Sequence, residues 1–393
     1  MTPPNPLLEM LRHAVVHTPY YAAQDWAKDF RKGKNIEFKD IPILAKDDLK
    51  TLTAEFYAAY DTKSEGVAVE KFTSGSTGVP LRLFKTPKHF NINAIENARL
   101  KSGWFPEDRS ISLGMNYPDD KNPAKSISIK QTANGGTHHT LYSFSSNDIA
   151  ELLEHLKPSL LKGRASVVLP ALQQLKNLDS LRLITTISEI LSPELVAFVK
   201  TMPNCGLVDV YGSVETGIIA ATCKLCGKYH LAERHMVIEV LDEKNIPTKP
   251  GNIGRIIITP LFNYAMPLIR YDIGDYVELS DSHSCQISRF AFNRIIGRER
   301  NLFKLPKGGK IIPNISPEDL LLYGIARYKL VQISKVGIEF RYLPSSPDTT
   351  ISSALAQKII ARNMSPEFQV EAISVTDFPT AANGKYLMHE CLI

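Results

Sequence analysis

Apolar, strand-like runs alternate with a helix-like segment between residues 110 and 210, and no other feature constrains the possible folds as strongly. Residues 149–156 show the apolar spacing of an amphipathic helix. The apolar runs predict strands at Ser110–Met115, Val167–Leu169, Leu183–Ile187 and Leu207–Val210. Because neighbouring parallel strands need a long connection, usually a helix, the alternation predicts an α/β domain with a substantial parallel sheet.

The chain has a different character on either side of this region. Residues 1–60 carry apolar side chains at helical spacing, so this part is expected to be mainly helical. From about residue 235, short strands separated by turn residues predict a β-barrel subdomain or a meander, with strands at Val237–Leu241, Gly254–Thr259 and Tyr276–Leu279. Beyond residue 297 we expect a smaller α+β segment, with strands at Leu330–Ser334, Ile338–Tyr342 and Val370–Val375 and a helix at Ser352–Asn363.

Residues 72–78 hold only hydroxyls and glycines after one aromatic side chain, Phe72. Glycines let a backbone approach a polyanion closely, and N–H groups and hydroxyls can then surround phosphate oxygens. No Gly-Lys-Ser/Thr follows at the spacing of a Walker A loop, which excludes that motif. On its own such a run is more often a flexible turn, so its meaning depends on the motifs that follow.

Four further motifs follow in a fixed order: Tyr211–Gly217, Met266–Asp275, Ile296–Arg298 and Asn383–Lys385. With these, and with Leu11–Tyr21 and Ile41–Leu49, the chain resembles the AMP-forming adenylation superfamily over nearly its whole length. Within that superfamily of acyl-CoA synthetases and peptide-synthetase adenylation domains, it is most similar to phenylacetate–CoA ligase-like enzymes. The resemblance implies an α/β fold in which a large N-terminal adenylate-forming domain, residues 1–297, is joined by a hinge to a small mobile domain, residues 298–393.

The resemblance also implies an activity. Members activate a carboxylic acid with ATP as an acyl-adenylate, release pyrophosphate and transfer the acyl group, and the phenylacetate-type relatives favour an aromatic acid and CoA. The transition state is rich in negative charge, so such a site supplies N–H donors, hydroxyls, Mg²⁺ and a mobile cation. ATP and Mg²⁺ are therefore the expected cofactors, and CoA is one candidate acyl acceptor.

The matching residues take their expected roles from the family. Lys385 would reach the carboxylate and the α-phosphate, Glu215 would ligate Mg²⁺, and both are expected to be catalytic. Asp275 would accept hydrogen bonds from the ribose hydroxyls, because a carboxylate offers two acceptor oxygens. The other nucleotide-binding residues are expected to be Thr73, Ser74, Gly75, Ser76, Thr77, Gly78, Ser188, Glu189, Asp209, Tyr211, Gly212, Ser213 and Arg298. Ser188 stands where the family has glycine.

A second group of residues has metal-ligand spacing. Cys223 and Cys226 lie in a Cys-x-x-Cys-Gly turn, which brings two thiolates together, and His230 follows four residues later. Cys285 would be the fourth ligand of a structural Cys₃His zinc site, and some phenylacetate–CoA ligase-like relatives carry cysteines there. The alternative is a set of reduced, buried cysteines with His230 hydrogen-bonded in the fold.

The chain departs from the family at the hinge. Arg300 and Asn301 stand where acidic residues are expected, and the following loop contains a proline and three lysines, Lys304, Lys307 and Lys310. The acyl acceptor therefore stays open between CoA, a carrier-protein thiol, and an amine or alcohol that is coupled directly. A non-catalytic nucleotide-binding protein is the non-enzyme alternative.

Composition limits the partners. A net charge of +5 is too small to indicate nucleic acid, and no run of about 18 apolar residues predicts a membrane span. Five cysteines, an odd number, do not suggest a secreted disulfide framework, and the N-terminus does not resemble a signal peptide. We therefore expect a cytoplasmic protein whose partners are a small carboxylic acid and an acyl acceptor, either as a monomer or as a homodimer.

Overall fold

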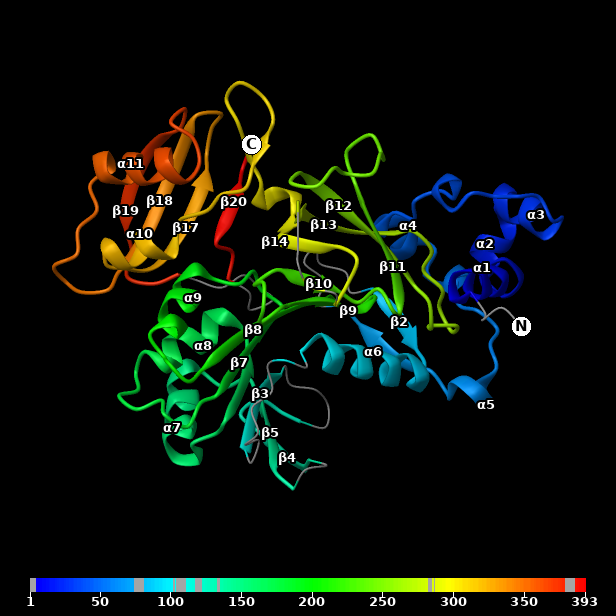
Figure 1. The fold of residues 1–393 in the computed structure, drawn as a ribbon, viewed down its shortest axis with the longest axis horizontal. Helices are drawn as coiled ribbons and strands as arrows, with labels where there is room; N and C mark the ends of the chain where they lie inside the picture. The colour runs from blue at the N-terminus through cyan, green and yellow to red at the C-terminus, as the bar shows by residue number, and fades with distance from the viewer. Residues whose placement is uncertain are drawn as a thin grey trace. The chain divides into compact units, whose positions relative to one another are not determined.

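The computed structural model describes residues 5–73, 81–101, 103, 111–116, 122–132, 135–281, 285, 287–378 and 386–393 (Figure 1). The chain forms two compact units, each built from two segments. The first comprises Met1–Gly103 and Tyr211–Gly297, and the second comprises Trp104–Val210 and Arg298–Ile393. One division falls between Gly297 and Arg298; that residues 298–393 move as a separate domain stays a prediction.

The first unit begins with short helices and then forms strands. Its first segment contains α1 (Pro6–His17), α2 (Pro19–Ala23), α3 (Asp25–Arg31), η1 (Phe38–Asp40), α4 (Lys46–Thr51), η2 (Thr53–Phe56), α5 (Thr62–Glu65), β1 (Val69–Phe72), β2 (Arg82–Lys85) and α6 (Pro87–Leu100). Its second segment contains β9 (Gly217–Thr222), β10 (Tyr229–Leu231), β11 (Met236–Leu241), β12 (Ile253–Pro260), β13 (Tyr271–Leu279) and β14 (Ala291–Arg298). The predicted helical N-terminus is confirmed, and the described strands follow the order β11-β12-β13-β14-β10-β9.

The second unit contains the predicted alternation of strands and helices. Its elements before residue 211 are β3 (Ile111–Asn116), β4 (Ile127–Gln131), β5 (Thr137–Tyr142), α7 (Ser146–Leu156), β6 (Leu160–Gly163), α8 (Ala165–Leu172), β7 (Leu183–Ile187), α9 (Pro193–Lys200) and β8 (Gly206–Ser213), the last of which continues into the first unit. The strand order is β8-β7-β6-β3-β5-β4. Every neighbouring pair from β8 to β5 is parallel, and β4 is antiparallel at the edge.

Helices α7, α8 and α9 pack on this sheet (Figure 1). Ile149 and Leu153 of α7 are buried against Leu161 of β6 and Ile184 of β7. A capping box formed by Ser145 and Asp148 begins α7, which explains why the predicted amphipathic helix starts there. The α/β fold class predicted from the alternation is confirmed.

One predicted strand is wrong. Residues 167–169 lie in helix α8, and the strand of this region is β6, just before it. A short apolar run fits a buried strand and a buried helix equally well. A distant residue favours the helix, because the Glu189 carboxylate accepts hydrogen bonds from the backbone N–H and the hydroxyl of Ser166 in its first turn.

The C-terminal part of the second unit forms a separate four-stranded sheet. Its elements are η3 (Glu299–Asn301), β15 (Phe303–Lys304), β16 (Lys310–Ile311), α10 (Pro317–Leu322), β17 (Ile325–Gln332), β18 (Gly337–Pro344), α11 (Ser353–Asn363), β19 (Gln369–Ser374) and β20 (His389–Cys391). The order is β19-β18-β17-β20, and Tyr328, Phe340 and Phe368 form its core with residues of α10 and α11. The predicted α+β segment is confirmed.

Among the residues that the structure describes, no helix has the length and apolar character needed to cross a bilayer. The expected cytoplasmic location stays a prediction.

Candidate functional site

Glu215 lies in the turn between β8 and β9 and is only 5% exposed. Its Oε1 accepts hydrogen bonds from Lys46 Nζ at 2.9 Å and from the Tyr271 hydroxyl at 3.4 Å. Burial alone would raise the pKa of Glu215, but the charge and hydrogen bond of Lys46 outweigh it and the pKa is lowered. The carboxylate is therefore anionic at neutral pH, as an oxygen ligand for Mg²⁺ must be.

Lys46 is a site residue that the sequence analysis missed. It begins α4, and the preceding Leu44 forms a bridge with β13: Leu44 N–H donates to Arg270 C=O, and Asp272 N–H donates to Leu44 C=O, both at 2.9 Å. The buried Arg270 guanidinium donates to the carbonyl oxygens of Lys39 and Ile41 in the same stretch. The signal in the sequence was the motif Ile41–Leu49, which contains Lys46.

Tyr211 and Asp275, which lie in two different sequence motifs, are in contact. The Tyr211 hydroxyl at the end of β8 donates to Asp275 Oδ2 of β13 at 2.8 Å. Gly212 follows, and a Cβ there would lie 2.6 Å from the Gly217 carbonyl oxygen, so this position requires glycine. The Ser213 hydroxyl accepts from Thr216 N–H at 3.2 Å and closes the turn that carries Glu215.

The predicted phosphate loop lies mostly outside the described residues. Of its residues, Thr73 is described, whereas Ser74, Gly75, Ser76, Thr77 and Gly78 are not. The predicted catalytic residue Lys385 also lies outside the described residues. Thr73 N–H donates to Leu81 C=O, and Leu81 N–H donates to Thr73 Oγ1, both at 3.0 Å. These bonds extend the β1–β2 hairpin to the two ends of the loop.

The remaining predicted nucleotide-binding residues lie in the second unit. Ser188 has φ +74°, a left-handed conformation that favours glycine, which explains the glycine of the family at this position. Asp209 Oδ1 accepts a hydrogen bond from the Thr186 hydroxyl at 2.5 Å, which links β8 to β7. The Glu189 carboxylate accepts hydrogen bonds from Ser166 and Tyr386, and Arg298 ends β14. The nucleotide roles of these residues stay predictions.

The lysine-rich stretch after the hinge forms the β15–β16 hairpin, with Gly308 and Gly309 at positive φ in its turn. Each lysine has a protein partner: Lys304 Nζ donates to the Ile393 carbonyl oxygen at 2.7 Å, Lys310 Nζ lies 2.9 Å from Glu299 Oε1, and Lys307 pairs with Glu367. All three lysines therefore take part in the structure of the C-terminal region.

Lys85, at the end of β2, is a second residue that the sequence analysis missed. It is 3% exposed, and its Nζ lies 3.1 Å from His89 Nε2. Burial lowers the pKa of Lys85 to about 7, while the charge of Glu215 acts in the opposite direction. Burial, followed by repulsion from Lys85, lowers the pKa of His89 to about 2, so His89 is neutral and can accept from the ammonium. No sequence pattern marked this pair.

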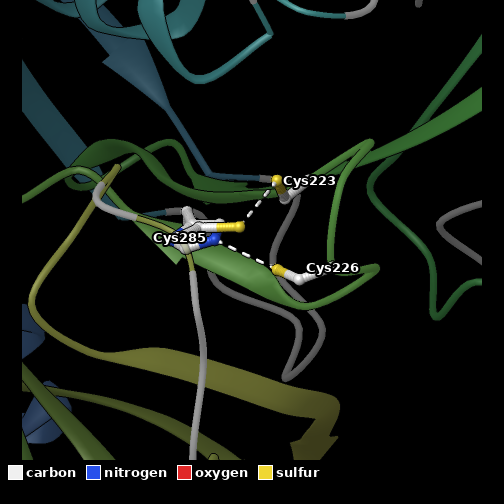
Figure 2. Close-up of side chains that lie close together, drawn as sticks. Cys223, Cys226 and Cys285 are labelled. Atoms are coloured by element: carbon white, nitrogen blue, oxygen red, sulfur yellow. Dashed lines mark hydrogen bonds between the residues drawn. The ribbon is translucent and has the colours of Figure 1, made fainter.

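All four predicted zinc ligands converge, and Figure 2 shows the three cysteines of the group close together. Cys223 and Cys226 lie in the turn between β9 and β10, His230 lies in β10, and Cys285 lies between β13 and β14. Their ligand atoms are all within 4.8 Å of one another. The turn is closed by Gly227 N–H donating to the Cys223 carbonyl oxygen at 2.9 Å, and Leu225 N–H donates to Cys223 Sγ at 3.4 Å.

The spacing of the donor atoms fits zinc. A zinc–sulfur bond of about 2.3 Å gives a tetrahedral sulfur–sulfur distance of about 3.8 Å, whereas a disulfide needs about 2.05 Å. Cys223 Sγ and Cys285 Sγ are 3.8 Å apart, and Cys226 Sγ lies 3.3 Å from His230 Nε2.

The hydrogen bonds around His230 also suit a metal ligand. The Ser288 hydroxyl donates its proton to the Phe290 carbonyl oxygen, so its oxygen accepts from His230 Nδ1–H at 2.7 Å. This tautomer leaves a lone pair on Nε2, the ring atom beside Cys226, and such an outer partner is typical of a metal-bound histidine.

Comparisons with known proteins concern the sequence and the fold of the chain. No protein-family model matches the sequence. A phenylacetate–coenzyme A ligase of Aromatoleum evansii is 23% identical over 354 residues, which cover 83% of this chain and 76% of that protein. The structure is similar to that of a 2-hydroxyisobutyryl-CoA ligase in its postadenylation state, with a TM-score of 0.71 and 16% identity over 98% of this chain and 87% of that chain.

An amide bond synthetase from Marinactinospora thermotolerans also has a similar structure, with a TM-score of 0.57 and 14% identity over 84% of this chain and 68% of that chain. These similarities confirm the resemblance that the sequence motifs predicted. The chain has the fold of the AMP-forming adenylation superfamily, and its sequence is similar to that of a phenylacetate–coenzyme A ligase.

Proposed function

We propose that the protein activates a carboxylic acid with ATP and transfers the acyl group to an acceptor. An oxygen of the acid's carboxylate attacks the α-phosphorus, the bond to the bridging oxygen of the β-phosphate breaks, and pyrophosphate leaves. The acceptor then attacks the carbonyl carbon of the acyl-adenylate and AMP leaves. With CoA as the acceptor, the thiol loses its proton and the product is a thioester.

The arrangement around Glu215 carries this proposal. A buried carboxylate whose pKa is held low lies one short turn from Tyr211, which in turn contacts Asp275. An acyl-adenylate-forming site needs an anionic metal ligand and an acceptor for a vicinal diol close together, and these residues supply both. In the reaction, Asp275 would accept from the ribose hydroxyls, and Tyr211 would hold the Asp275 carboxylate in position.

The other roles follow the family motifs. Residues 73–78 would bind the β- and γ-phosphates, Arg298 would meet the ribose or a phosphate, and Lys385 would bridge the attacking carboxylate and the α-phosphate. Mg²⁺, held by Glu215, would supply positive charge beside the phosphates. The Glu215 carboxylate fits that ion, because it is anionic and offers hard oxygen donors.

Acid-dependent exchange of pyrophosphate into ATP tests the first half-reaction. The assay would use phenylacetate, benzoate, nicotinate and hexanoate as representative aromatic, heteroaromatic and aliphatic acids. We expect exchange with at least one aromatic acid. Binding of ATP without exchange for any acid would favour a non-catalytic nucleotide-binding protein.

We propose CoA as the acceptor and an aromatic acid as the substrate, supported by the similarity to a phenylacetate–CoA ligase. Direct coupling to an amine or alcohol is the second candidate. It is favoured by the departure at Arg300 and Asn301 and by the structural similarity to an amide bond synthetase. Incubation with ATP and an accepted acid, with and without CoA, separates them by product mass. AMP release without an acyl-CoA product would favour direct coupling.

We propose that Cys223, Cys226, His230 and Cys285 bind one structural Zn²⁺. The set is closed, with four protein ligands and no position for a substrate, which is typical of structural zinc. We expect one zinc per chain in protein purified without chelator, measured by elemental analysis, and none in a variant in which Cys226→Ser is combined with Cys285→Ser. In the native protein, the three cysteines of this cluster could instead react with a thiol reagent as ordinary free thiols and release no zinc. That result would contradict the site.

A further inference from the structure

Two carboxylates of the second unit hold backbone groups of the C-terminal region. Glu189 lies between β7 and α9, and Glu194 lies in the first turn of α9. Their partners, Tyr386 and Tyr328, lie just before β20 and within β17. The two contacts therefore join the parallel-sheet part of this unit to the smaller four-stranded sheet.

The Glu189 carboxylate accepts hydrogen bonds from two parts of this unit, helix α8 and the segment just before β20. Its Oε2 accepts from Ser166 N–H at 3.0 Å, and its Oε1 accepts from the Ser166 hydroxyl at 2.8 Å, which fixes the carboxylate on the first turn of α8. The same Oε1 accepts from Tyr386 N–H at 3.1 Å. Tyr386 directly follows Lys385 in the sequence, so the carboxylate holds the backbone at the residue next to the predicted catalytic lysine.

Glu194 forms the second contact. It is 6% exposed, and its Oε1 accepts from Tyr328 N–H at 3.2 Å. The Tyr386 hydroxyl donates to the Tyr328 carbonyl oxygen, so the two held segments are also tied to each other. The guanidinium carbon of Arg327 lies 4.4 Å from the centre of the Tyr386 ring. Glu194, Arg327 and Tyr386 line a small pocket together with Ser166 and Met388.

The contact is incompletely paired. Among the described residues, Glu194 Oε2 and Arg327 Nη2 are buried without a hydrogen-bond partner. A buried polar network that is only partly satisfied is less favourable than one with all its partners, because each unpaired group has lost its water. Separation of the two surfaces would return both groups to solvent. Opening this contact therefore costs less than opening a fully satisfied one.

We propose that Glu189 and Glu194 are positioning residues that together form a carboxylate latch, holding Tyr386 and Tyr328 during acid activation and releasing them for acyl transfer. The latch rests on the proposed function, and it assigns to Glu189 a role on the C-terminal backbone in addition to its expected place near the nucleotide. Glu189 acts on Lys385 only through the backbone of Tyr386. Its loss should therefore affect the step that uses Lys385.

The first test measures the latch without any reaction. Hydrogen–deuterium exchange would be followed at peptides that contain Tyr386 and Tyr328 in the full-length protein. We expect Glu189→Ala to speed exchange at the Tyr386 peptide and Glu194→Ala to speed it at the Tyr328 peptide, each by at least about tenfold, because each loses the acceptor of a buried N–H. Glu194→Gln keeps an acceptor oxygen and should preserve protection. Unchanged protection in both alanine variants would overturn the latch.

Two controls separate the latch from a general loss of structure. Ser166→Ala removes one of the two bonds on the α8 side of Glu189 but leaves its contact with Tyr386, so the Tyr386 peptide should stay protected. Glu318 of α10 has a side chain that is 74% exposed and lies 3.6 Å from Lys200, so Glu318→Ala should change neither peptide. Faster exchange throughout the unit in the Glu189 or Glu194 variants would show a structural role and would contradict positioning.

The second test compares the two half-reactions. With phenylacetate, or the panel acid that gives the fastest exchange, Glu189→Ala should lower acid-dependent pyrophosphate exchange about ten- to a hundredfold through kcat, because small misplacements of a reacting group have effects of this size. Glu194→Ala, at a residue outside the expected nucleotide-binding set, should lower pyrophosphate exchange as well, and with this variant transfer from preformed acyl-adenylate to the acceptor should change less than twofold. An equal loss in both half-reactions would overturn the proposal. If the native protein activates no acid, the proposed function fails. Hydrogen–deuterium exchange alone then decides whether Glu189 and Glu194 hold the two segments.

Discussion

Glu215 in the first unit and Glu194 in the second are two carboxylates with almost equal exposure, 5% and 6%, and opposite electrostatics. Glu215 contacts the ammonium of Lys46, which outweighs the effect of burial and lowers the pKa of the carboxyl. Glu194 accepts from a backbone N–H, and burial raises its pKa to about 7 although Arg327 is nearby.

The difference shows that burial alone does not determine whether a carboxylate is charged. The group that contacts the carboxylate determines the direction in which its pKa shifts. A direct cation keeps Glu215 charged at any pH where the enzyme would work, which suits a metal ligand. Glu194 exchanges a proton near neutral pH, which suits a contact that is made and broken.

Removal of the predicted mobile cation should have the largest effect. Lys385→Ala should lower acid-dependent pyrophosphate exchange by about 10²–10³, because a positioned cation is lost from a charge-rich transition state. The matched control is Lys34→Ala, which alters another Gly-Lys pair whose lysine is 2.9 Å from Asp29 and exposed. Unchanged exchange in Lys385→Ala would remove the assigned role.

Neutralisation of Glu215 should come next. Glu215→Gln keeps the size of the side chain and removes its charge, and we expect exchange to fall about a hundredfold at moderate Mg²⁺. Raising the Mg²⁺ concentration should recover part of the rate, because the remaining defect is weak metal binding. Glu37→Gln, which alters an exposed carboxylate paired with Lys39, should show neither effect. A rate that does not depend on Mg²⁺ in native protein would contradict the assignment.

Glu194 should make stability depend on pH near neutrality. Its pKa is about 7 in the folded protein and ordinarily 4.5, so the folded state binds the proton more tightly. The unfolding free energy should then fall as pH rises from about 4.5 to about 7, by at most about 3 kcal/mol, and level off above. Among the described residues, the charged or titratable groups that interact with Glu194 are Arg327, Tyr328 and Tyr386.

Urea unfolding of native protein and Glu194→Gln at pH 5, 6, 7 and 8 measures this dependence. The variant should lose the decrease between pH 5 and pH 7, because glutamine does not titrate. A parallel decrease in both proteins would show that another group causes it, and Glu194 would no longer contrast with Glu215.

The smallest expected effect concerns Ser188, which precedes Glu189 and has φ +74°. Ser188→Gly should raise the unfolding free energy by about 1 kcal/mol, because glycine adopts this conformation without a steric penalty. Ser188→Val should lower it. Urea unfolding measures both, and a destabilised glycine variant would show that the serine hydroxyl matters more than the backbone conformation.

Much of the fold could be predicted from the sequence because its elements have strong local signals. The amphipathic pattern at 149–156 and the turn-bounded strands after residue 235 lie where they were expected. Residues 167–169 were assigned wrongly, because a short apolar run has no decisive period and the helix is favoured by Glu189, a residue about twenty positions further along the chain. Lys46 was missed for a similar reason, since its partner Glu215 is 169 residues away.

The sequence by itself determined the family resemblance, the α/β class and the identity of the metal-ligand candidates, because motif order and residue type are properties of the chain. The tertiary structure decided which of those residues meet: Cys285 reaches the Cys223–His230 turn, Tyr211 reaches Asp275, and Glu215 reaches Lys46. It also decided the charge of each buried group. A pKa depends on desolvation and on partners within a few ångströms, and long-range folding alone brings those partners together.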